Sequence, residues 1–211
     1  MDEYLVPFAD GASEFTEKRS RFISRLWRTE NEDEARARIE ETKKQHYDAR
    51  HNCWCYSIRA GGIVRYSDDG EPQGTAGQPM LNVFQREGVT DFCCVVTRYF
   101  GGVLLGAGGL TRAYSKGAKD ALDNGGVSRV SPWTLWEVPC PYPLLERIKL
   151  ELAAVNAAVE NADYGETVTL LAAFPKSGAE DFSLRLTELS AGALSMTKRG
   201  EEFRPGPREP R

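Results

Sequence analysis

The alternation of apolar and polar positions predicts both strands and helices in this chain. Residues 51–58 alternate as a strand, with Trp54, Tyr56 and Ile58 on one face and His51, Cys53 and Cys55 on the other. Residues 91–97 are apolar almost throughout, which is typical of a central strand buried on both faces. We therefore expect a sheet whose middle strand lies near residue 95.

Two helices are predicted around these strands. Asn31 and Glu34 form a capping-box pattern at the start of the first. The second has the clearest period of the chain, with one buried stripe at Leu110, Ala113, Tyr114, Gly117, Ala118, Ala121 and Leu122. The same spacing places Arg112, Ser115, Lys116 and Lys119 on its exposed face, which predicts a basic surface.

The pattern resets near Ser131 and Pro132, where we expect a linker. The following residues predict strand, helix, strand, strand, helix and strand between 133 and 198, which is the order of a ferredoxin-like domain. We therefore expect an α+β fold with domains over 1–130 and 131–200. A proline-rich tail over 201–211 is expected to be disordered.

Composition narrows the class of protein. The 41% hydrophobic and 27% charged residues are typical of a globular protein, and a net charge of -4 argues against coating nucleic acid by bulk charge. The N-terminal residues have no signal-peptide pattern, and no apolar run reaches membrane-spanning length. Five cysteines in mostly apolar segments indicate reduced thiols. We expect a cytoplasmic protein without a membrane partner.

Two glycine-dense segments, 67–79 and 98–114, are the candidate sites. The second leads from a strand into a helix, so its free N–H groups, assisted by Arg98 or Arg112, suit an anion. It is neither a Walker loop nor a dinucleotide fingerprint. The alternative is that its glycines allow tight turns and close packing, and spacing alone leaves both open.

The first segment carries three carboxylates, on Asp68, Asp69 and Glu71. They suit a divalent cation, but they are also typical of a solvated, capped turn, which we favour. His46 and His51 with Cys53 and Cys55 suggest zinc, yet buried thiols explain the cysteines better. We assign no metal, cofactor or catalytic residue, and keep His51 as a candidate proton carrier.

The candidate binding residues come from the two loops, the adjacent strand and the basic helix face. They are Arg98, Tyr99, Gly101, Gly102, Gly106, Gly108, Gly109, Arg112, Lys116, Lys119, Asp68, Asp69, Gly70, Glu71, Gly74, Thr75, Gly77 and His51.

Residues 68–79 and 98–110, together with His51-Asn52-Cys53-Trp54, closely resemble the IMPACT/YigZ family over roughly residues 13–125. The resemblance implies a first domain with the ribosomal protein S5 domain 2-like fold, similar to domain IV of elongation factor G. It implies a ferredoxin-like second domain similar to domain V of that factor. Eukaryotic relatives restrain a kinase of initiation factor 2 and carry an RWD domain that this chain lacks, so that role is not transferred.

Three hypotheses about function follow. The leading one is a non-enzymatic, translation-associated protein that binds RNA or the ribosome through the glycine-rich loop and the basic helix face. The second is a protein that regulates translation or stress-response factors through protein partners. The third is a small-molecule or peptide hydrolase that uses Asp68, Asp69, Glu71 and His51, although the sequence gives no positive sign of an enzyme.

Overall fold

The computed structural model describes residues 3–175 and 177–210, which form two compact units. The first contains residues 4–129 and 205–210, and the second contains residues 3 and 130–204. Both combine helices with a mainly antiparallel sheet, so the predicted two-domain α+β fold is confirmed. No helix within these described residues is long and apolar enough to span a membrane.

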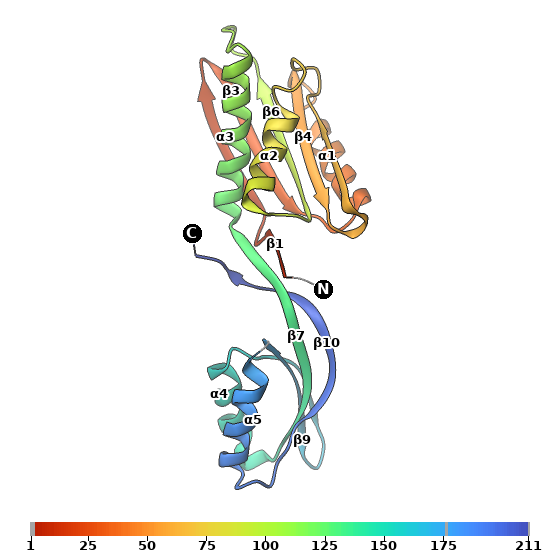
Figure 1. Cartoon of the computed structure of the whole chain (residues 1–211), viewed down its shortest axis with the longest axis vertical. Coiled ribbons are helices and arrows are strands. Elements are labelled where there is room, and N and C mark those ends of the chain that lie inside the picture. Colours follow the sequence, from red (N-terminus) through yellow and green to blue (C-terminus); the bar gives the residue numbers. More distant parts are fainter. Residues whose placement is uncertain (1–2, 176, 211) are drawn as a thin grey trace. The chain divides into compact units, whose positions relative to one another are not determined.

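The first unit is built on a five-stranded antiparallel sheet. Its order is β2 (Gly11–Glu17), β3 (Ser20–Arg28), β6 (Phe92–Tyr99), β4 (His51–Ile58) and β5 (Ile63–Ser67). Helices α2 (Gly77–Glu87) and α3 (Ala107–Gly125) cover one face, and α1 (Glu32–Gln45) covers the other (Figure 1). A 3₁₀ turn over Ala60–Gly62 joins β4 to β5.

Each face of this sheet has its own apolar core. On β4, Cys53 and Cys55 pack beneath α2 and α3, whereas Tyr56 and Ile58 pack beneath α1. The predicted alternation of this strand is therefore confirmed. Residues 92–98 of β6 are all buried because both faces of the middle strand are covered by helices.

Helix α3 has the buried stripe that its period predicts, from Leu110 to Leu122, and it packs over β2 and β3. Helix α1 begins with the predicted cap, since the Asn31 side chain accepts from the Glu34 N–H at 2.9 Å. The second glycine segment leads from the end of β6 at Tyr99 into the start of α3 at Ala107.

The second unit has the predicted β-α-β-β-α-β order. Its strand order is β10 (Thr197–Arg208), β7 (Val127–Cys140), β9 (Val168–Pro175) and β8 (Ala158–Tyr164). The strand β1 (Tyr4–Pro7), whose residues belong to the first unit, also pairs with β7. Helices α4 (Leu145–Ala154) and α5 (Gly178–Leu189) supply the buried Ile148, Leu152, Phe182 and Leu186.

Two expectations about chain connections differ from the structure. Ser131 and Pro132 lie within the long strand β7 instead of a linker, because the fixed φ of proline fits an extended backbone. The expected disordered tail is a strand through Arg208. Two hydrogen bonds hold the backbone of this tail against β7. The Ser128 hydroxyl donates to the Gly206 carbonyl at 2.7 Å, and the Glu209 N–H donates to the Val127 carbonyl at 2.8 Å.

Candidate functional site

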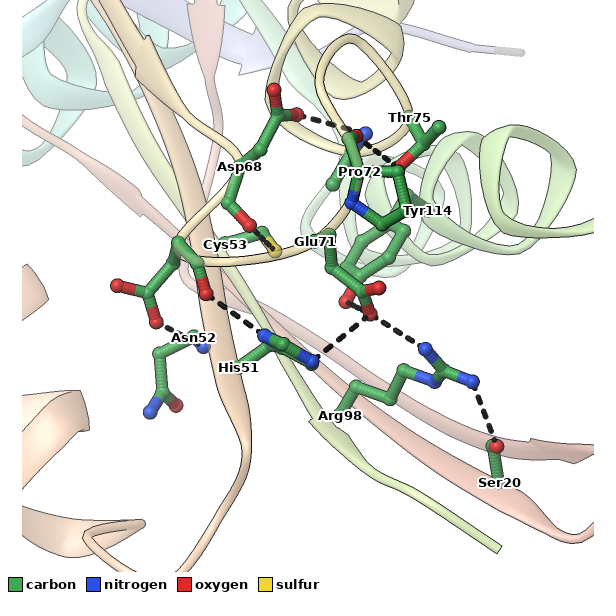
Figure 2. A network of polar contacts seen from close by, with 12 residues as sticks. Ser20, His51, Asn52, Cys53, Asp68, Glu71, Pro72, Thr75, Arg98 and Tyr114 are labelled. Carbon is green, nitrogen blue, oxygen red and sulfur yellow. Dashed lines mark hydrogen bonds and ion pairs between the residues drawn. The ribbon is translucent and has the colours of Figure 1, made fainter. Parts of the chain in front are cut away.

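A buried ion pair joins the two glycine-dense segments. Glu71 belongs to the first segment and Arg98 lies at the end of β6, where the second begins. Arg98 Nη1 donates to Glu71 Oε1 at 2.7 Å, and Tyr114 of α3 donates its hydroxyl to the same oxygen at 2.8 Å. Figure 2 shows both donors converging on this carboxylate. Burial raises the pKa of Tyr114, so its hydroxyl stays a donor.

His51 lies against the same carboxylate. Its Nδ1 is 2.8 Å from the Asp69 carbonyl oxygen, which only accepts, so Nδ1 carries the proton. Its Nε2 is turned toward Glu71 and lies 3.9 Å from Oε1 (Figure 2). His51 therefore faces the carboxylate-bearing first segment.

Asp68 has a structural task. Its Oδ1 accepts from the N–H groups of Ala76 at 3.0 Å and Gly77 at 2.9 Å, and its Oδ2 accepts from Gly74 at 2.8 Å. These bonds fold the first loop onto the start of α2, as a capped turn does.

Asp69 is also engaged. Its Oδ2 accepts from the Asn52 N–H at 2.7 Å, and its Oδ1 is 3.3 Å from Lys43 Nζ. Thr75 closes the loop by donating its hydroxyl to the Pro72 carbonyl at 2.6 Å. Gly70 lies over the His51 ring, and a Cβ added at Gly70 would lie 3.4 Å from His51 Nδ1, in ordinary van der Waals contact. The geometry therefore favours a rigid loop over an acid–base set built from both aspartates.

The cysteines beside this loop are thiols. All five are free and buried, and Cys53 donates from Sγ to the Asp68 carbonyl at 3.0 Å. Burial raises the pKa of Cys53, which keeps the thiol protonated and makes it a poor zinc ligand. Among the described residues, no group of three or more His, Cys, Asp or Glu side chains could hold a metal ion.

The second glycine segment turns tightly before α3. A Cβ on Gly101 would lie 2.0 Å from the Arg19 carbonyl oxygen, so the β2–β3 turn packs directly on this backbone. Gly106 has φ +73° and precedes α3 without a side-chain cap. Gly102 lies in the exposed part of the turn, while Gly108 and Gly109 belong to the first turn of α3. The interpretation of these glycines as turn and packing residues therefore applies at Gly101 and Gly106, and the anion interpretation stays a prediction.

The expected basic surface is only partly present. Arg98 is buried in the ion pair instead of facing solvent, because its strand lies in the middle of the sheet. Lys116 pairs with Asp120, and Lys119 pairs with Asp123 at 2.5 Å and Glu87 at 3.5 Å. The Tyr99 hydroxyl donates to Asp48 at 2.9 Å and not to the Glu71–Arg98 ion pair.

Four other cations surround the second segment instead. Within residues 3–175 and 177–210, the exposed side chains of Lys18, Arg19, Arg50 and Arg112 have no ion pair or hydrogen bond. Of these, the sequence reasoning named only Arg112. The Lys18-Arg19 pair at a hairpin turn and Arg50 beside His51 are sequence signals that could have indicated the others.

A pocket of about 360 Å³ opens beside the buried pair. Its polar side is formed by Arg50, His51, Glu71 and Arg98, and its apolar side by Phe100, Leu104, Leu105 and Leu110. Leu104 is 81% exposed at the tip of the loop. The site is therefore a polar floor beneath an exposed apolar rim, at the N-terminal end of α3.

Comparison with known proteins places the chain in a family. Residues 18–122 match the Impact N-terminal domain, and residues 138–193 match a domain of unknown function, DUF1949. The IMPACT family member YigZ of Escherichia coli is 37% identical over 199 residues, covering 93% of this chain and 98% of that protein. YvyE of Bacillus subtilis, also an IMPACT family member, is 40% identical, covering 95% of this chain and 93% of that protein. This chain belongs to the IMPACT family.

A solved structure is also similar to this chain. A crystal structure of a hypothetical protein shares 37% identity with a TM-score of 0.60, covering 93% of this chain and 97% of the other. The match to the IMPACT N-terminal domain spans every residue of the pocket, from Arg50 to Leu110. The site described above therefore lies wholly within the IMPACT domain.

Proposed function

We propose that this protein binds RNA or the ribosome through the surface around its second glycine segment, as a translation-associated, non-enzymatic protein of the cytoplasm. The observation that carries the proposal is a group of four exposed cations around this segment, Lys18, Arg19, Arg50 and Arg112, that have no partner among the described residues. Arg50 borders one pocket, Lys18 and Arg112 border a second, and the two pockets share Leu105. The Arg19 backbone contacts Gly101. The cations therefore gather around one loop.

Unpaired cations are the groups that bind phosphates. A lysine or arginine already neutralised by a carboxylate releases few counterions from RNA, whereas a free one contributes fully to affinity and salt dependence. The net charge of -4 makes such a local cluster more selective, because the rest of the surface repels RNA. Phe100 and the free N–H groups of the loop add a stacking surface and anion recognition.

The two kinds of cation on α3 provide a matched test. Arg112→Ala removes a free cation, and Lys119→Ala removes one that pairs with Asp123 and Glu87. Affinity for a structured RNA or for ribosomes would be measured over a range of salt concentrations. We expect Arg112→Ala to weaken binding and lower the salt slope by about one unit, and Lys119→Ala to change the slope less. Identical slopes in all three proteins would refute the proposal.

The exposed apolar rim supports a protein partner as the second candidate. Leu104 is 81% exposed, and Phe100 and Val103 beside it are also exposed. Apolar side chains grouped on one loop are typical of protein interfaces. A pull-down with the intact chain and with Leu104→Asp separates the two candidates. Capture of a translation factor that resists nuclease and high salt, and is lost in Leu104→Asp, would favour the protein partner over RNA.

A further inference from the structure

The start of α3 presents unused donors to the pocket. The first backbone hydrogen bond of the helix runs from the Leu110 N–H to the Gly106 carbonyl at 3.0 Å. The N–H groups before Leu110 therefore have no acceptor within the helix. No side chain caps them, and Gly106 and Ala107 line the pocket. The helix has 19 residues, so the positive end of its dipole also lies here.

A second feature independently points to a ligand at the same place. The Arg98 side chain lines the pocket with only 6% exposure, and its Nε is a buried donor without a partner among the described residues. Its two other nitrogens are used, by Glu71 at 2.7 Å and by Ser20 at 3.2 Å (Figure 2). A buried donor without an acceptor is unfavourable, so a small shift of the Arg98 side chain toward an anion in the pocket would give Nε an acceptor.

The floor of the pocket accepts hydrogen bonds. His51 Nδ1 lies 2.8 Å from the Asp69 carbonyl oxygen, which turns Nε2 toward Glu71 at the floor of the pocket. Glu71 Oε1 is occupied by Arg98 and Tyr114, and Oε2 has no donor within the described part of the chain. The pocket therefore combines donors for an anion with acceptors for a neutral N–H group.

The walls have the size and character for a flat apolar ring. The volume of about 360 Å³ lies in the range of small-ligand sites, and Phe100, Leu104 and Leu110 supply apolar surface. An aromatic side chain beside acceptors is how proteins hold an unpaired base of RNA. A phosphate, a ring and an amino group within one small unit describe a nucleotide.

We propose that this pocket receives one unpaired nucleotide. Its phosphate lies at the start of α3 near Arg98 and Arg50, its base packs against Phe100, and an amino group of the base donates to the Glu71–His51 floor. The inference rests on the RNA-binding function proposed above and adds the unit of RNA that is recognised. The same chemistry is present in a free nucleoside monophosphate.

The first experiment tests the pocket without RNA. The intact protein, labelled with ¹⁵N, would be titrated with adenosine, cytidine and uridine 5′-monophosphates. We expect the Arg98 Nε–H signal and the amides of residues 106–109 to shift in a saturable way, with uridine monophosphate the weakest because uracil has no amino group. The inference is overturned if millimolar nucleotide leaves these signals unchanged, or if shifts spread over the surface without saturation.

The second experiment distinguishes an RNA unit from a free nucleotide. Affinity would be compared for an RNA hairpin with a single-nucleotide bulge and for the fully paired hairpin. Phe100→Ala should weaken binding of the bulged RNA about tenfold and that of the paired RNA little. Tyr66→Ala is the matched control, because Tyr66 is an aromatic residue of similar exposure on β5, outside the pocket.

The failures of the two proposals are distinguishable. Equal binding of bulged and paired RNA by the wild-type chain, with Phe100→Ala lowering neither, contradicts an RNA nucleotide in the pocket and leaves RNA binding intact. Absence of binding to either RNA and to ribosomes refutes the proposed function, whereas the nucleotide titration still decides whether the pocket takes a nucleotide.

Discussion

Glu71 and Arg98 lie 27 residues apart in the sequence and form an ion pair of 2.7 Å in which neither side chain is more than 6% exposed. Removing one partner leaves a buried charge without its counter-ion. Arg98→Met should therefore lower the free energy of unfolding by about 3–5 kcal/mol, measured by urea denaturation.

A double variant separates the pair from its surroundings. Glu71→Gln with Arg98→Met removes both charges, so it should be more stable than Arg98→Met alone. Destabilisation of the double variant by the sum of the two single effects would show that the ion pair is not what couples these residues.

Asp68 should contribute to stability and not to chemistry. Asp68→Ala removes the acceptor of three backbone N–H groups, at Gly74, Ala76 and Gly77. We expect a loss of about 1–2 kcal/mol in thermal or chemical unfolding. Asp163→Ala, an exposed aspartate on β8, is the control and should change stability by less than about 0.5 kcal/mol. A stable Asp68→Ala protein would contradict the capping role.

Two glycines of the second segment should respond differently to alanine. Gly101→Ala places a Cβ 2.0 Å from the Arg19 carbonyl oxygen, so the β2–β3 turn must move, at a cost of about 1–3 kcal/mol. Gly108→Ala meets only the end of the Arg112 side chain at 3.4 Å and should be neutral or slightly stabilising. Equal unfolding midpoints for the two variants would contradict the close packing at Gly101.

Asp91 should make stability depend on pH. Burial raises the pKa of Asp91, although its carboxylate accepts from the Arg59 N–H at 2.6 Å. A raised carboxyl pKa means that the unfolded chain ionises first, so ionisation of Asp91 costs stability as pH rises above its unfolded pKa. Asp91→Asn should therefore gain stability relative to the wild type between pH 3 and pH 7. Parallel pH–stability curves for the two proteins would contradict this expectation.

The elements whose residues face one environment were predictable from the sequence. The stripe from Leu110 to Leu122 and the alternation of β4 each follow from a single period, because one face is buried along the whole element. The order of the second domain was predictable for the same reason. The extension of β10 beyond residue 198 was not, because its proline-rich residues are held by distant partners such as Ser128.

The candidate site was harder to predict, since its key contacts join distant residues. Glu71 follows two aspartates, and a run of carboxylates indicates a solvated turn; only Arg98 and Tyr114, far along the chain, explain its burial. A helical period correctly placed Lys116 and Lys119 on the exposed face of α3, yet it could not show which cations are free. Lys116 and Lys119 are neutralised by Asp120 and Asp123, which lie four residues further along the helix.

The salt dependence of RNA binding tests the central claim most directly. The wild type would be compared with a variant in which Lys18, Arg19, Arg50 and Arg112 are replaced by alanine, and with the Lys116→Ala, Lys119→Ala variant as control. The account predicts that log K against log salt becomes shallower by about three to four units in the fourfold variant and by less than one in the control. Equal slopes for the wild type and the fourfold variant would contradict it.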